Sequence, residues 1–127
     1  MADLSPSEAQ LEILQILWDQ EPATVRQIHE TMLKNKQVGY TTVLKQIQRM
    51  TEKGLVTAEK EGRSFVYRSS VQEGQIKKTL FDRLKDTAFK GSSIDLVMHA
   101  LGNSKPSKEE IDQLTAWLAE KRKEQEG

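Results

Sequence analysis

A change of periodicity at Gly54 constrains the fold of this chain more than any other feature. Before it, apolar residues recur at three- and four-residue spacing through residues 39–53, which predicts an amphipathic helix closed by a left-handed glycine. After it, residues 55–60 and 64–68 are rich in β-branched and aromatic residues and flank a connector that contains Gly62, which predicts a hairpin. A helix must therefore pass directly into a two-stranded ribbon.

The predicted helix at residues 39–53 has one apolar side and one basic side. The apolar side is assigned to the core, with Leu44 at its edge, and comprises Tyr40, Val43, Ile47 and Met50. The opposite side carries hydrogen-bonding and basic residues: Thr41, Thr42, Lys45, Gln48 and Arg49. Side chains of these types contact base edges and phosphates in the DNA major groove, so we predict that they bind DNA. Lys36, Lys53 and Arg63 are predicted to contact backbone phosphates, with the neighbouring minor groove as the alternative for Arg63.

Capping signals mark two further helices before this one. Ser5 and Ser7 each begin a possible capping box for the first helix, and the sequence leaves the choice between them open. The apolar stripe of this helix comprises Leu11, Leu14, Leu17 and Trp18, with Ile13 on the flank. Thr24 and Gln27 begin a second helix, whose inward face comprises Val25, Ile28, Met32 and Leu33. Three helices followed by a hairpin predict a winged helix-turn-helix, with the hairpin as the wing.

Helical periodicity also runs through the C-terminal part of the chain. Breaks at Gly91 and at residues 102–106 separate three predicted helices, the last of which begins with a capping box at Ser107. Three helices of this size cannot bury their large apolar side chains alone, so we predict an intertwined homodimer. The residues assigned to its interface are Ile76, Leu80, Leu84, Leu96, Val97, Leu101, Ile111, Leu114, Trp117 and Leu118. The predicted fold is mainly α with a small β-hairpin wing: a winged-helix DNA-binding domain at residues 1–72, followed by a three-helix dimerisation module at residues 73–127.

Charge is unevenly distributed along the chain, although the formal net charge is zero. Residues 1–33 carry one basic and six acidic side chains, whereas residues 34–68 carry eight basic and three acidic ones. The positive field therefore coincides with the predicted DNA-binding helix and wing. This distribution favours double-stranded DNA as the partner. The alternative is a winged-helix module that binds an acidic protein and no DNA.

No residue pattern in the sequence indicates an enzyme, a cofactor or a metal site. His29 and His99 are isolated in sequence and the chain has no cysteine, so we assign neither histidine to a metal. We find no Gly-rich phosphate loop and no nucleophile elbow, and we expect no catalytic residue. No apolar run approaches the roughly 18 residues of a membrane span, and the N-terminus lacks the features of a signal peptide. The expectation is a soluble, cytoplasmic protein without a membrane partner.

Four segments carry a resemblance to a known family: SEAQLEILQILWD, TTVLKQIQRMTEKGLV, EGRSFVYRS and the C-terminal FKGS…DLV…SKEEIDQL. Across about Ser7 to Lys121 the chain resembles the BlaI/MecI-type penicillinase repressor family. The resemblance implies a dimeric winged-helix repressor of bacterial operons, with the N-terminal module on DNA and the C-terminal helices swapped around each other. The expected target is a palindromic operator whose half-sites lie about one helical turn, or a multiple of it, apart.

The same resemblance implies a partner for induction, a membrane-sensor protease that cuts in the helix after Gly91. The resistance repressors carry Asn-Phe at the cut, and this chain has His99 and Ala100 there. Copper-responsive relatives carry a C-terminal cysteine cluster, which this chain lacks. The sequence therefore leaves the inducing signal open.

Overall fold

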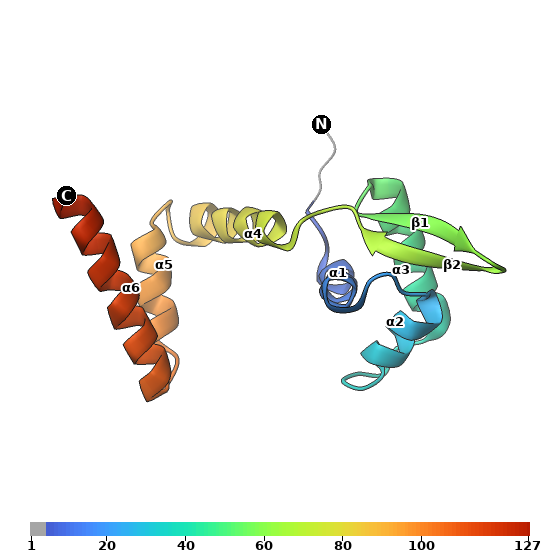
Figure 1. The fold of residues 1–127 in the computed structure, drawn as a ribbon, viewed down its shortest axis with the longest axis horizontal. Coiled ribbons are helices and arrows are strands. Elements are labelled where there is room, and N and C mark those ends of the chain that lie inside the picture. The colour runs from blue at the N-terminus through green and yellow to red at the C-terminus, as the bar shows by residue number, and fades with distance from the viewer. Residues whose placement is uncertain (1–4) are drawn as a thin grey trace. The chain divides into compact units, whose positions relative to one another are not determined.

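The computed structural model describes residues 5–127, whose order of elements is shown in Figure 1. The elements are α1 (Glu8–Gln20), α2 (Val25–Met32), α3 (Tyr40–Lys53), β1 (Val56–Glu61), β2 (Ser64–Ser69), α4 (Glu73–Ala88), α5 (Ser93–Gly102) and α6 (Lys108–Glu126). This order confirms the predicted fold class, a mostly helical chain with one antiparallel hairpin. Contacts divide the chain into two compact units, residues 1–81 and 82–127, which are described separately below.

Capping boxes set the starts of three helices. The Ser7 hydroxyl accepts from the Gln10 N–H at 3.2 Å, and the Gln10 side chain accepts from the Ser7 N–H at 3.0 Å. The structure therefore selects Ser7, rather than Ser5, as the cap of α1. Thr24 caps α2 and Ser107 caps α6 in the same reciprocal way, as the sequence predicted.

The core of the first unit lies where α1, α2, α3 and the hairpin meet. Its fully buried large side chains are Ile13, Leu14, Leu17, Ile28, Val43, Ile47, Met50 and Leu55. Leu14 and Leu17 of the stripe predicted on α1 are buried as expected, whereas Ile13 lies in the core rather than on its flank and Leu11 is only half-buried. The inward prediction for Leu33 was wrong. Because α2 ends at Met32, Leu33 follows as its C-cap residue and is 43% exposed.

Gly54 ends α3 and turns the chain into the hairpin. Its φ of 86° lies in the left-handed region, and its N–H donates to the carbonyl oxygens of Met50 and Thr51. The N–H of Leu55 also donates to the Met50 carbonyl oxygen, at 2.9 Å. These bonds satisfy carbonyl groups at the helix end that would otherwise lack partners.

The hairpin is a two-stranded antiparallel sheet that we call the wing (residues 56–69). Its strands pair in one continuous register and leave Gly62 and Arg63 as a two-residue turn, with Gly62 at a φ of 63°. Ala23 joins the wing through an isolated bridge, in which its N–H and carbonyl exchange hydrogen bonds with Tyr67 at 3.1 and 2.8 Å. The segment between α1 and α2 is thereby attached to β2.

The second unit, residues 82–127, leaves its large apolar side chains exposed. None of these residues is buried within the single chain. The exposed set comprises Leu84, Ile94, Val97, Met98, Leu101, Ile111, Leu114, Trp117 and Leu118. Despite this apolar surface, no helix within residues 5–127 has the length and apolarity needed to cross a membrane.

Candidate DNA-binding surface

α3 is held to the core along one side and presents polar residues along the other. Val43, Ile47 and Met50 are at most 1% exposed. The predicted DNA-binding residues of this helix all lie exposed: Thr41, Thr42, Lys45, Gln48 and Arg49. Because α3 also contacts β1, the polar side of the helix has a fixed position relative to the wing (Figure 1).

Tyr40 is the exception on the apolar side of α3. It is 46% exposed, so its assignment to the core was wrong. The physical reason is its place at the first position of the helix, where no preceding turn covers it. Its ring instead packs edge-on against His29, with 5.7 Å between ring centroids. Leu44, one turn later, is half-buried against the core, in agreement with its predicted position at the edge.

A solvent-open groove lies among α2, α3 and the wing. Tyr40 and Leu44 line its α3 side, Arg63, Phe65 and Tyr67 line its wing side, and residues of α2 complete it. Burial raises the pKa of the Tyr67 hydroxyl, and neighbouring Tyr40 adds to this shift. Phe65 is 52% exposed and gives the groove an open aromatic wall. The groove thus places the Arg63 of the wing turn and the start of α3 along one continuous surface.

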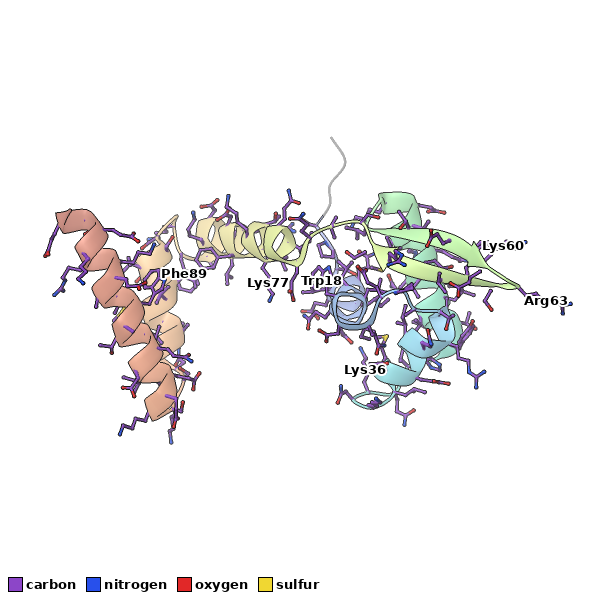
Figure 2. The ribbon with its side chains drawn as sticks, viewed as in Figure 1. Trp18, Lys36, Lys60, Arg63, Lys77 and Phe89 are labelled. Carbon is purple, nitrogen blue, oxygen red and sulfur yellow. The ribbon has the colours of Figure 1, made fainter. Side chains whose placement is uncertain are left out.

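The three other predicted basic residues differ in their surroundings. Arg63 projects from the tip of the wing, as Figure 2 shows. The Lys36 Nζ lies 3.2 Å from the Glu12 Oε1 in an ion pair between exposed side chains. Such a pair contributes about 0–1 kcal/mol, little enough for a phosphate to replace the carboxylate. Lys53 is half-buried, and its Nζ donates to the Ser5 carbonyl oxygen at 2.8 Å, so it ties the start of the chain to the end of α3.

Sequence reasoning left one residue of this region, His29, without a role. The Nε2 of His29 lies 2.7 Å from the carbonyl oxygen of Val38, nine residues away across the turn between α2 and α3. This contact and the contact with Tyr40 join residues of different elements, so the periodicity of a single helix does not predict either of them. Among the residues that the structure describes, no group of three or more potential ligands is placed to hold a metal ion.

The comparison with known proteins assigns the family. Residues 6–120 match the family model described as Penicillinase repressor. The chain belongs to the penicillinase repressor family. It is 25% identical over 114 residues to the penicillinase repressor of Bacillus licheniformis, a match that covers 90% of this chain and 89% of the relative. It is 28% identical over 115 residues to the methicillin resistance regulatory protein MecI of Staphylococcus aureus (strain N315), covering 91% of this chain and 94% of MecI.

One solved structure has a fold similar to that of this penicillinase repressor family member. It is described as the solution structure of the DNA binding domain of the repressor BlaI. The match has 26% sequence identity and a TM-score of 0.52, and it covers 57% of this chain and 90% of that chain. The family resemblance and the winged-helix fold class predicted from the sequence are both confirmed.

Proposed function

We propose that this penicillinase repressor family member is a cytoplasmic, homodimeric transcriptional repressor that binds a palindromic DNA operator. The observation that carries the proposal is the division of α3 into a buried apolar side and an exposed side with hydroxyl, amide and cationic groups. The wing next to α3, with Arg63 at its tip, completes the arrangement of a winged helix. The BlaI domain that shares the fold is described as DNA-binding, which supports the proposal.

In this proposal α3 enters the major groove with its N-terminal turn foremost. Thr41 and Thr42 in that turn bind base edges or phosphates, and Lys45 binds a phosphate. Gln48 and Arg49 have the donors and acceptors for bidentate contacts with bases. One DNA strand then runs along the groove between α3 and the wing, and Arg63 reaches a phosphate or the neighbouring minor groove.

Lys36 and Lys53 contribute in a different way from the α3 side chains. Lys36 is exposed and exchanges its carboxylate partner for a phosphate when DNA binds. Lys53 keeps its hydrogen bond to the start of the chain, and its charge adds to the positive potential at the end of α3. The DNA-binding roles of Lys36 and Lys53 are predictions, and substitution of each lysine, followed by measurement of DNA affinity, tests them.

Dimerisation follows from the apolar surface of the C-terminal helices. The proposed interface comprises Leu80, Leu84, Leu96, Val97, Leu101, Ile111, Leu114, Trp117 and Leu118. Of these, Leu80 and Leu96 are half-buried within the single chain and the others are exposed. Ile76 is only 3% exposed, so we assign it to the core of its own chain instead. Burial of the other side chains against a second copy removes this surface from water, and the resulting two-fold symmetry matches a palindrome.

Selection of bound duplexes from a randomised pool tests the proposal. The full chain should enrich an inverted repeat, and Arg49→Ala should weaken binding to it or relax the preference at one position in each half-site. Lys77→Ala is the matched control, since Lys77 is an exposed basic residue of α4 outside the proposed surface. A pool without enrichment, together with no retention on random duplex at about 50 mM salt, would refute the proposal and favour the protein-binding alternative.

A further inference from the structure

The first turn of α3 has no side-chain cap, in contrast to four other helices. The N-cap residues of α1, α2, α5 and α6 each accept a hydrogen bond from a backbone N–H; they are Ser7, Thr24, Ser92 and Ser107. The N-cap of α3 is Gly39, which has no side chain to do so. Free N–H groups at a helix start therefore lack local support at the turn that carries Thr41 and Thr42.

His29 holds this start from a neighbouring helix. Its Nε2 lies 2.7 Å from the carbonyl oxygen of Val38, the residue immediately before Gly39. Its ring meets the ring of Tyr40, the residue immediately after Gly39, with an angle of 81° between the ring planes. Since a carbonyl oxygen only accepts hydrogen bonds, the proton of a neutral His29 is on Nε2. The two contacts fix the chain on both sides of the uncapped glycine.

The backbone of His29 belongs to a helix that packs in the core. It lies in α2 between Ile28, which is 0% exposed, and the buried Met32. The carbonyl oxygen of His29 accepts from the Leu33 N–H at 2.9 Å, which closes the last turn of α2. The imidazole therefore extends from a helix packed in the core to the residues on both sides of Gly39, of which Val38 is half-buried against the core and Tyr40 is 46% exposed.

We infer that His29 is a positioning residue for operator recognition, which acts through Val38 and Tyr40 to orient the first turn of α3 before DNA binds. This inference rests on the proposed function, because it gives the oriented turn a task. A turn already ordered in the free protein loses less conformational freedom on binding, and side chains held in place discriminate better among base edges. His29 touches no DNA in this role.

Three variants separate the two contacts of His29. His29→Ala removes both, His29→Phe keeps an aromatic ring without the N–H, and His29→Gln keeps an N–H donor without the ring. Gln37→Ala is the matched control, because Gln37 is exposed in the connection between α2 and α3, next to Val38. Affinities are measured for the duplex selected by the wild-type full chain and for a random duplex, with circular dichroism to show that each variant is folded.

We expect His29→Ala to bind the selected duplex about tenfold more weakly, which corresponds to about 1.4 kcal/mol. Its affinity for the random duplex should stay within about twofold, because phosphate contacts carry little sequence information. His29→Gln should recover more of the lost affinity than His29→Phe. Three results would overturn the inference: a wild-type affinity of His29→Ala for the selected duplex, an equal loss of affinity for both duplexes, or a full recovery of affinity in His29→Phe. If His29→Ala does not fold, the comparison of the Gln and Phe variants decides.

A spectroscopic measurement on the free protein separates this inference from the proposed function. In mildly alkaline buffer, long-range proton–nitrogen NMR spectra should show His29 as the Nε2–H tautomer. A separate nitrogen–carbon experiment should show a coupling between His29 Nε2 and the Val38 carbonyl carbon across the hydrogen bond. The Nδ1–H tautomer would overturn the inference even if the protein binds an operator. Failure of the wild-type protein to select any DNA would instead refute the repressor function, whatever the tautomer.

Discussion

Replacement of Gly54 by alanine tests the left-handed turn through which α3 passes into the wing. Gly54 has φ 86° and ψ 15°, a left-handed conformation that costs an L side chain about 1–2 kcal/mol. A Cβ added at this position meets no atom within 4 Å, so steric overlap adds nothing to the cost. The N–H of alanine can still donate to the carbonyl oxygens of Met50 and Thr51. We therefore expect the free energy of unfolding to fall by about 1–2 kcal/mol, from the backbone conformation alone.

Gly74→Ala is the matched control, and its effect should have the opposite sign. Gly74 lies in the first turn of α4, has no positive φ, and a Cβ added there also meets nothing within 4 Å. Alanine should therefore raise the free energy of unfolding by about 0.5–1 kcal/mol, because it loses less backbone freedom in a helix than glycine does.

Urea unfolding followed by far-ultraviolet circular dichroism measures both changes. The two variants and the wild type are compared at one protein concentration, because the proposed dimerisation would make stability depend on concentration. The midpoints should shift in opposite directions while the slope of each transition stays unchanged. A Gly54→Ala variant as stable as the wild type would refute the left-handed helix end at this position.

Three further outcomes follow from the structure. Trp18→Phe should lower the free energy of unfolding by about 1–2 kcal/mol in urea titrations, because the indole N–H donates to the Ser69 hydroxyl at 3.0 Å. Backbone and side-chain hydrogen bonds from Ser107 lower the pKa of Glu110, so their stabilising effect is present above the unfolded-state pKa and is lost as pH falls through the lower folded-state pKa. Ser107→Ala removes the hydroxyl but keeps the backbone N–H, so it should raise the Glu110 pKa only part of the way toward its ordinary value in an NMR titration; an unchanged pKa would contradict the contribution of the Ser107 side chain. Leu118→Asp, at a side chain 59% exposed in the single chain, should convert the proposed dimer to a monomer in sedimentation at micromolar concentration, and a dimer of this variant would contradict the proposed interface.

The helix boundaries were predictable because their determinants are local. The capping boxes at Thr24 and Ser107 join groups three residues apart, and Gly54 follows directly after the last residue of α3. The exposure of the polar residues on α3 was also predictable, since one helical period fixes both sides of a helix once one side is buried. The opposite sides of α3 in the structure agree with that reasoning.

Features that depend on distant contacts or helix ends were not predictable in the same way. Tyr40 and Leu33 have the right spacing for the core, but each lies at the end of a helix, where neighbouring turns no longer cover the side chain. The bridge between Ala23 and Tyr67 joins segments far apart in sequence, and a single residue has no strand periodicity to detect. The hydrogen bond from Lys53 to the Ser5 carbonyl oxygen could not be predicted either, because the two residues are far apart in sequence and meet only in the folded protein.

The salt dependence of operator binding tests the central claim most directly. The affinities of the wild-type full chain and of Lys45→Ala are measured on the selected inverted-repeat duplex over a range of salt concentrations. The affinity for DNA decreases as salt increases, so the slope of log affinity against log salt is negative. If α3 of each subunit places Lys45 at a phosphate, this slope should become less steep in Lys45→Ala by about 0.9 per subunit, or roughly 2 for a dimer. An unchanged slope with unchanged affinity would contradict the account, because the exposed side of α3 would then not face DNA.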